Sequence, residues 1–301
     1  MEKWTEMQVF VESVRRGSFS AAARHLNLSP SAVSKLVSRL ETRLGVRLLN
    51  RSTRAISPTE GGRCYFERCV DILAEVESAE DSLIGFGHVP VGTLRINCTP
   101  GFAKHLLLPL MPEFQRLYPR LTVEFQLTGQ AIDLIAEDVD LAIRLGKLKD
   151  TSLVGLKLGE SRRIVCASPN YLKEHGEPRF PSDLEEHNCL RLSTNEAFNR
   201  WSFGSARGIE VIEVKGNFVT DNVDLLHEYM QLGGGIGRLS AFMVSRDIER
   251  GQLVQLFPEF KIERQQIHAV YPHRKHMPMK VKILLDFLTS RFSSSFGGDI
   301  G

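Results

Sequence analysis

Two short helical repeats of apolar residues follow one another near the amino end of the chain. The first repeat consists of Phe19, Ala22, Ala23 and Leu26. The second has apolar residues at helical spacing, at Val33, Leu36, Val37, Leu40 and Leu44. Asn27 and Leu28 separate the repeats, Ser29 suits the N-cap of the second helix, and Pro30 suits its first helical position. The pattern predicts two helices joined by a tight turn.

The opposite face of the second helix is small or basic, and we expect it to enter a groove of DNA. Its residues are Ser31, Ser34, Lys35 and Ser38. Small side chains let a helix lie deep in the major groove, and a lysine can meet phosphate or a base edge. Amphipathic helix pairs are common, so the pattern alone leaves DNA binding undecided. Charge favours it, because the segment from Arg15 to Arg68 holds eleven Lys and Arg against three Glu, whereas the whole chain carries +2.

A basic hairpin is predicted directly after the two helices. Leu48 and Leu49 suit a short strand, and Arg51 and Arg54 flank a hairpin tip that contains Thr53. Arginines at such a tip can follow the DNA backbone or enter a narrow minor groove, although a solvated loop remains an open alternative for either one alone. From both features we expect DNA contacts at Ser29, Pro30, Ser31, Ser34, Lys35, Ser38, Arg51, Thr53 and Arg54.

A long helix capped by Thr59 is predicted to continue to about Phe86. Its apolar residues alternate in steps of four and three, which makes a heptad stripe: Tyr65, Cys69, Ile72, Val76, Ala79, Leu83 and Phe86. Its outer face is acidic. A helix with one narrow apolar stripe needs a partner, either its own chain or a second copy, and we expect the second copy because helix-turn-helix proteins commonly pair on two half-sites.

After Gly92 the pattern changes to alternating strands and helices. Strands are expected over 94–98, 123–127 and 141–143, with helices over 106–118 and near 132–137. This alternation predicts an α/β sheet with largely parallel strands, whose ligands lie beyond the carboxyl ends of the strands.

Polar and glycine residues at these strand ends are candidate ligand contacts. Most belong to three segments: Thr99, Gly101 and Phe102 after the first strand, Thr128 after the second, and Thr220 and Asn222 further on. Arg144 follows the third strand and could pair with a carboxylate. Each residue also has a structural alternative, because the threonines could cap helices and Arg144 could pair with Asp138 or Asp140. Gly233 to Gly235 match no nucleotide-binding motif and predict a helix end and tight turn.

The amino-terminal part resembles the winged helix-turn-helix of the LysR-type transcriptional regulators. The residues that carry the resemblance over 4–61 are Phe10, Val14, Gly17, Ser18, Phe19, Ala22, Ala23, Leu26, Ser29, Ser31, Ala32, Val33, Ser34, Leu40, Glu41, Leu44, Gly45, Leu48, Arg51, Thr59, Glu60 and Gly61. Leu49 stands where that family usually has phenylalanine.

The remainder, to about residue 290, resembles the inducer-binding domain of the same family, which has two lobes like the periplasmic binding proteins. The matching residues are Leu108, Pro109, Phe114, Tyr118, Pro119, 138–144, Ala167, Ser168, Pro169, Tyr171, Leu172, 187–190, Trp201, Gly216 and Asn222.

The resemblance implies a multidomain architecture with an all-α winged helix-turn-helix, a long linker helix and a two-lobed α/β domain. The expected parts are 1–61 for DNA binding, 59–88 for dimerisation, 92–290 for effector binding and 291–301 as a disordered tail. Lobe I would comprise 92–165 and 267–290, and lobe II 166–266, with the crossovers near Cys166 and Ile267. The effector would lie between the lobes, where Gly237 would line the cleft.

The resemblance also implies partners: double-stranded DNA, a second copy through 59–88, and a dimer of dimers. RNA polymerase is a further candidate partner.

Other classes of function find little support. The chain has no apolar run of membrane-spanning length, and Met1 to Met7 do not resemble a signal peptide, so we expect a cytoplasmic protein without a membrane partner. The five cysteines lack Cys-x-x-Cys spacing and are expected to be buried. His268, His273 and His276 lack metal-site spacing, and no nucleophile elbow occurs, so we expect no catalytic residue, metal or cofactor. The alternative function is that of a small-molecule carrier without specific DNA readout.

Overall fold

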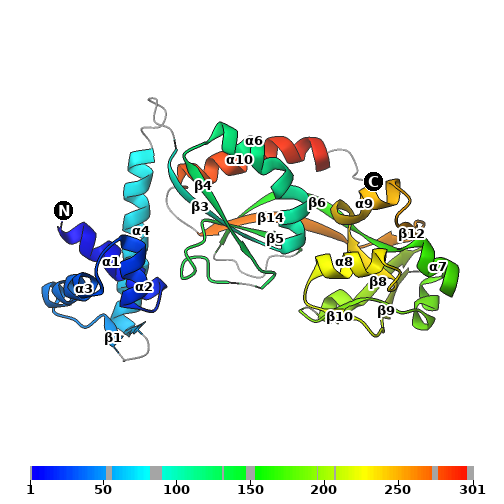
Figure 1. The fold of residues 1–301 in the computed structure, drawn as a ribbon, viewed down its shortest axis with the longest axis horizontal. Helices are drawn as coiled ribbons and strands as arrows, with labels where there is room; N and C mark the ends of the chain where they lie inside the picture. Colours follow the sequence, from blue (N-terminus) through cyan, green and yellow to red (C-terminus); the bar gives the residue numbers. More distant parts are fainter. Residues whose placement is uncertain are drawn as a thin grey trace.

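The computed structural model describes residues 2–51, 56–81, 90–130, 132–146, 153–194, 196–206, 208–272 and 277–296. A helical amino-terminal domain lies at one end of an elongated molecule, and two α/β lobes follow it along the long axis (Figure 1). None of the helices in these ranges combines the length and apolar character needed to cross a bilayer.

The amino-terminal domain is a helix-turn-helix with a two-stranded wing. Its elements are α1 (Glu2–Arg15), α2 (Phe19–Leu26), α3 (Pro30–Leu44), β1 (Leu49–Arg51), β2 (Ile56–Pro58) and the long helix α4 (Glu60–Asp81). Asn27 ends α2 in the left-handed conformation, with φ of 55°. Ser29 caps α3, because its hydroxyl accepts a hydrogen bond from the Ala32 amide at 3.2 Å. The turn, the cap and the helix-starting Pro30 are therefore as predicted.

The predicted apolar stripe of α3 forms the core of this domain. Val33, Val37 and Leu40 are fully buried, and they belong to one cluster with residues of α1, α2 and α4. The stripe is not buried along its whole length, because Leu36 is half-buried and Leu44 is 37% exposed. Leu44 is the last residue of α3, directly before the left-handed Gly45 that ends the helix.

The apolar stripe of α4 divides into two parts. Thr59 caps the helix as predicted, accepting from the Gly62 amide at 2.9 Å. Cys69 is buried in the cluster that includes α1, so this end of α4 packs on its own chain. Ile72 and Val76 are 47% and 37% exposed, and Leu83 and Phe86 lie outside the described residues.

Lobe I is built on three parallel strands and their helical connections. Its elements are β3 (Gly92–Cys98), α5 (Pro100–Phe102), η2 (Ala103–Leu107), η3 (Leu108–Leu110), α6 (Met111–Leu117), β4 (Leu121–Leu127), β5 (Leu141–Leu145), the first part of β6 (Leu153–Ala167), β14 (Arg264–Pro272) and α10 (Met279–Phe296). Strand β3 pairs in parallel with β4 and β5, but β14 pairs antiparallel with both β5 and β6. The prediction of a largely parallel sheet is thus wrong outside β3, β4 and β5, because the chain returns from lobe II through β14.

Two further local predictions are corrected. Residues 132–137 form turns and no helix, because the Asp133 carboxylate accepts the amides of Ile135 and Ala136 and the chain then bends at Asp138, where φ is +54°. Helix α10 continues to Phe296, so the first six residues of the expected disordered tail are helical. Phe292 is buried in the core of lobe I, which holds this end of the helix.

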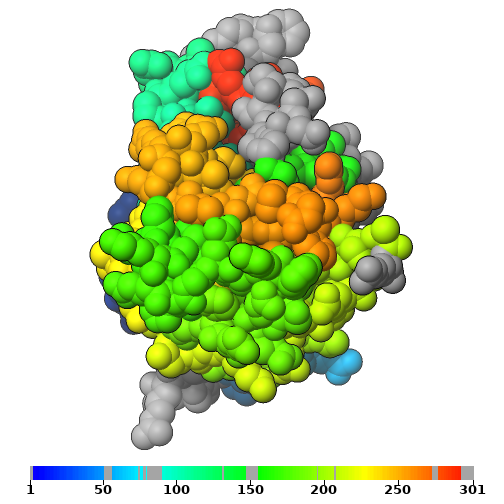
Figure 2. Space-filling model, turned by 90° about the vertical axis from the view of Figure 1, so that its right-hand side faces the viewer, coloured from blue at the N-terminus to red at the C-terminus, as the bar shows by residue number. Residues whose placement is uncertain are grey.

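Lobe II contains the middle of the chain. Its elements are α7 (Pro169–His175), η4 (Pro181–Glu186), β7 (Arg191–Leu192), η5 (Glu196–Asn199), β8 (Arg200–Ser205), β9 (Gly208–Glu213), β10 (Val219–Thr220), α8 (Val223–Gln231), β11 (Gly237–Ser240), α9 (Ala241–Glu249), β12 (Val254–Leu256) and β13 (Lys261–Ile262). Strand β6 joins the lobes, because its first part pairs with β14 and its residues 163–167 pair with β11 and β12. Figure 2 views this end of the molecule, where the green segment that includes β6 and α7 lies beside the orange segment near β12.

Candidate DNA-binding and effector sites

The predicted reading face of α3 is open to solvent. Ser29, Pro30, Ser31 and Lys35 are exposed, whereas Ser34 and Ser38 are half-buried. The Ser38 hydroxyl donates to the Ser34 carbonyl at 2.9 Å, which holds it close to the helix. The face therefore combines short side chains, which lie close to the helix, with one projecting cation. This combination suits a helix in the major groove.

Two buried glutamates on α1 neutralise part of the basic surface. Glu6 is 3% exposed and accepts from Arg43 at 3.0 Å, with Arg39 at 3.7 Å. Glu12 is 7% exposed and pairs with Arg15 and Arg16 at 3.1 and 2.8 Å. The charge count along the sequence missed these acids because both precede Arg15. Among the residues that the structure describes, four of these cations thus have structural partners within the domain.

The wing is partly described. Strands β1 and β2 form the antiparallel hairpin expected from Leu48 and Leu49, and Arg51 belongs to β1. Thr53 and Arg54 lie outside the described residues.

Arg144 is held at the carboxyl end of β5 without a carboxylate partner in the described residues. Its Nη1 donates to Asn97 Oδ1 at 2.6 Å. The alternative that it pairs with Asp138 or Asp140 is wrong, since these acids pair with Arg15, Arg95 and Lys280. Burial lowers the pKa of the Arg144 guanidinium.

The same end of the sheet contains a neutral thiol. Cys98 is buried at the end of β3, and burial raises its pKa to about 12, with an opposing effect from Arg144. A thiol with this pKa stays protonated at neutral pH and offers no negative charge to the arginine.

The other polar candidates form local hydrogen bonds to backbone amides, including the helix caps that the sequence left open as an alternative. Thr99 caps α5, its hydroxyl accepting from the Phe102 amide at 3.4 Å. Asn222 caps α8 by accepting from two amides, at 2.8 and 3.2 Å. Thr128 and Thr220 each accept from the amide two residues further on, at 3.2 and 3.1 Å. These bonds fix the positions of the side chains and leave further lone pairs on the oxygens.

Two of the apolar and glycine candidates face the cores of the lobes, and the third lies between the lobes. Phe102 is 1% exposed in the core of lobe I. Gly237 is buried, and a Cβ there would meet Met230 Sδ at 2.9 Å, so this position faces the core of lobe II instead of an effector. A Cβ on Gly101 would lie 3.0 Å from Val223, so Gly101 is a point of close contact between the lobes.

Sequence reasoning missed an ionic contact between the lobes. Lys104 and His105, on η2 of lobe I, lie 3.2 and 3.3 Å from the same carboxylate oxygen of Asp224, on α8 of lobe II. The ring of His227 stands 5.9 Å from the ring of His105 and pairs with Asp247 at 2.7 Å. No motif marks the contact between the lobes, because His105 and Asp224 are 119 positions apart in the chain.

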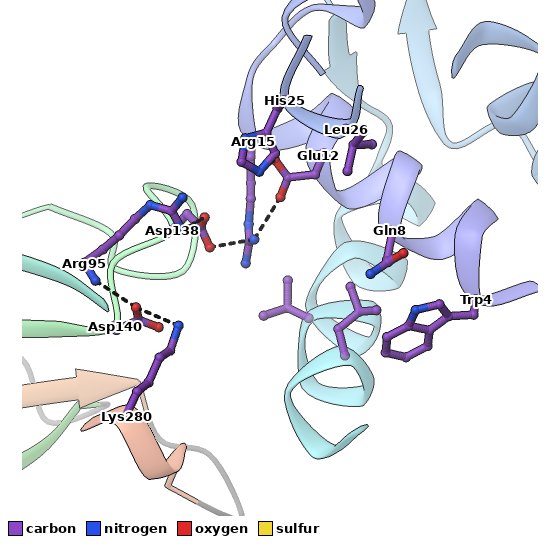
Figure 3. A pocket seen from close by; sticks show the side chains of 12 residues that line it. Trp4, Gln8, Glu12, Arg15, His25, Leu26, Arg95, Asp138, Asp140 and Lys280 are labelled. Carbon is purple, nitrogen blue, oxygen red and sulfur yellow. Dashed lines mark hydrogen bonds and ion pairs between the residues drawn. The ribbon is translucent and has the colours of Figure 1, made fainter. Parts of the chain in front are cut away.

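A polar pocket of about 220 Å³ lies where the amino-terminal domain meets lobe I (Figure 3). Asp138 accepts from Arg15 of α1 at 2.6 Å and from Arg95 of β3 at 2.7 Å. Asp140 accepts from Lys280 and from the Arg95 amide, both at 2.9 Å. The DNA-binding domain is therefore ionically linked to the first lobe.

The cysteines also differ from expectation at one position. Cys69, Cys98, Cys166 and Cys189 are buried as predicted, whereas Cys64 is exposed.

Comparisons with known proteins agree with this arrangement of domains. The model of the bacterial regulatory helix-turn-helix protein, lysR family, matches residues 4–63, and the model of the LysR substrate binding domain matches residues 87–293. The chain belongs to the LysR family of transcriptional regulators.

The similarity to individual relatives covers nearly the whole length of this chain and of each relative. It is 38% identical to the HTH-type transcriptional activator AaeR of Escherichia coli over 97% of this chain and 94% of that protein. The solved structure of CrgA from Neisseria meningitidis aligns with a TM-score of 0.66 at 37% identity, covering 96% of this chain and 98% of CrgA. Full-length AphB of Vibrio cholerae aligns with a TM-score of 0.62 at 26% identity, covering 95% and 98%.

Proposed function

We propose that this LysR-type regulator reads an operator with the exposed face of α3 and changes its DNA binding or bending when a small molecule binds between the lobes. The observation that carries the first part is the solvent-facing surface of Ser31, Ser34, Lys35 and Ser38, opposite the buried stripe. Arg51, Thr53 and Arg54 on the wing would add backbone or minor-groove contacts.

DNA binding is tested by a gel shift at fixed salt with fragments selected from the source genome. Lys35→Ala should weaken binding about tenfold, whereas Lys173→Ala, an exposed lysine of α7 in lobe II, should leave it unchanged. Equal affinities for both variants and the unsubstituted protein would place the reading surface elsewhere. Failure to retard any duplex at low salt would favour the alternative function of a small-molecule carrier.

The effector site is proposed at the carboxyl ends of the lobe I strands. Arg144 supports it, because a half-buried guanidinium held by Asn97 and lacking a carboxylate in the described residues can pair with an anionic group of a ligand. Thr99, Thr128, Thr220 and Asn222 would supply hydroxyl and amide contacts. The protein would need no cofactor or metal and would catalyse no reaction.

The assembly is proposed to be a dimer through α4 and then a dimer of dimers. Ile72 and Val76 support the first contact, because they continue the apolar stripe past the part that packs on α1 and are exposed in the single chain. RNA polymerase would be a further partner at regulated promoters. A regulator with these partners acts in the cytoplasm, where the bacterial chromosome lies.

A further inference from the structure

Two arginines of lobe II converge on one aromatic ring. The guanidinium carbons of Arg163, on β6, and Arg238, on β11, lie 4.8 and 5.6 Å from the centroid of the Phe198 ring. Arg238 also lies 5.8 Å from the ring of Trp201. Arg238 is only 1% exposed, whereas Arg163 is partly exposed. Two positive charges are therefore gathered inside one lobe.

The described residues supply little negative charge to this pair. Glu263 Oε2 lies 3.8 Å from Arg238 Nη1, which is too far for a hydrogen bond, and the Glu263 side chain is 56% exposed. The hydrogen bond that the structure gives the Arg238 guanidinium runs from Nη2 to the Phe198 carbonyl, at 2.8 Å. Burial, and then the nearby charge of Arg238, lower the pKa of Arg163 to about 9. Burial lowers the pKa of Arg238 to about 10.

The same place holds a surplus of hydrogen-bond donors. Four buried nitrogens have no acceptor within the part of the chain that the structure describes: Arg163 Nε, Arg238 Nε, Arg238 Nη1 and Trp201 Nε1. Buried donors are nearly always paired in folded proteins, so an unpaired group indicates a missing water or ion. Here the unpaired groups are all donors and two of the residues are cations, which is the chemistry of an anion receptor.

We propose that Arg163 and Arg238 form a binding site for a small carboxylate in lobe II. Planar guanidinium groups match the in-plane lone pairs of a carboxylate, and the partly exposed Arg163 gives access from solvent. The Arg238 side chain lies on the opposite face of β11 from the candidate effector contact Gly237. Gly237 precedes Arg238, but successive residues of β11 point to opposite faces, and Gly237 faces Met230.

The test uses thermal unfolding of the full chain in sodium acetate, with sodium chloride at matched ionic strength as reference. Acetate should raise the Tm of the unsubstituted protein with a saturable concentration dependence. Arg238→Met should abolish this rise, and it should also raise the Tm in chloride because it removes a buried, poorly compensated charge. Arg163→Gln should weaken the apparent affinity for acetate about tenfold or more.

Arg250→Gln is the matched control, because Arg250 is an exposed arginine at the end of α9 in the same lobe. It should leave the acetate effect unchanged. An equal acetate effect in the unsubstituted protein, Arg238→Met and Arg163→Gln would overturn the proposal. Stabilisation by inorganic phosphate but not by acetate would overturn the assignment to carboxylates.

Two further measurements separate loss of acetate binding from misfolding and from loss of DNA binding. If Arg238→Met does not fold, the partly exposed Arg163→Gln carries the same comparison. Operator binding without acetate should be unaffected in all variants, because α3 lies in a different domain. Loss of the acetate effect with intact DNA binding therefore separates this proposal from the proposed function.

Discussion

Arg15 of the DNA-binding domain donates to Asp138 of lobe I at 2.6 Å. The side chains are 14% and 25% exposed, so the pair is more enclosed than a typical surface salt bridge. Asp138 adopts a left-handed backbone with φ of +54° and also accepts from Arg95. A strained residue with two arginine partners marks the point where the lobe meets α1.

We expect a measurable coupling energy between Arg15 and Asp138. A double-mutant cycle of Arg15→Gln and Asp138→Asn, followed by thermal or urea unfolding, should give about 1 kcal/mol, near the upper end for partly exposed pairs. Arg15→Gln combined with Asp140→Asn is the control, because Asp140 bonds to Lys280 and to the Arg95 amide instead. That control should be additive to within about 0.5 kcal/mol. Additivity in both cycles would mean that the interdomain contact contributes nothing in solution.

Strand β5 links this contact to the candidate effector site. Asp138 and Asp140 precede the strand, and Arg144 lies near its far end. Strand β3 has the same arrangement, with Arg95 toward α1 and Asn97 bound to Arg144. A ligand that moves Arg144 therefore acts on the strands that hold the DNA-binding domain, which gives the coupling a physical route.

Arg144→Gln should remove the response to effector and spare operator binding. The amide can still donate to Asn97 but carries no charge for an anionic ligand. We expect operator affinity without effector to change less than about twofold, while a reporter under the operator loses induction. Asn97→Asp is the complementary variant, since a carboxylate beside Arg144 would compete with the ligand. Loss of operator binding in Arg144→Gln would show that the residue supports the fold.

The local features of the DNA-binding domain could be predicted from the sequence because each depends on neighbours in the chain. Ser29, Pro30 and the stripe through Leu40 are set by capping, backbone geometry and helical period. The buried position of Glu6 could not be predicted, because its arginine partners lie on α3 and are brought to it only by packing.

The effector domain was harder to predict, because its strand pairings depend on residues that are far apart in the chain. The return of β14 alongside β5 joins residues that are more than a hundred positions apart, and nothing in its own sequence shows the direction of pairing. Residues 132–137 have helical periodicity, but Asp133 binds the following amides and closes a turn. Thr99 and Thr128 directly follow β3 and β4, as the alternation predicted, but only the fold shows that Phe102 and Gly237 face the two cores.

A charge on the exposed part of α4 should weaken self-association. Ile72→Glu places a carboxylate in the proposed dimer seam, where burial without a partner is unfavourable. We expect the dimer dissociation constant, measured by sedimentation equilibrium, to rise at least about tenfold. Asp71→Lys, an exposed neighbour off the stripe, should have little effect. Circular dichroism should be unchanged for both variants, and equal association of both would contradict a seam through Ile72.

Stability should fall on mild acidification because of His105 at the contact between the lobes. Burial lowers the pKa of His105 from its ordinary value of 6.5, although Asp224 partly opposes this effect. The unfolded chain therefore takes up the proton first as the pH falls. The contribution of His105 to the free energy of unfolding is complete above about pH 6.5. It is lost progressively as the pH falls below that value, toward the lower pKa of His105 in the folded state.

The test compares the free energy of unfolding between about pH 7 and pH 5 in three proteins. His105→Gln should show a shallower decrease than the unsubstituted chain. Asp224→Asn should show a steeper one, because it removes the charge that raises the pKa of His105 while leaving Lys104 and His227, which lower it. Identical slopes in all three proteins would mean that this contact between the lobes does not sense pH.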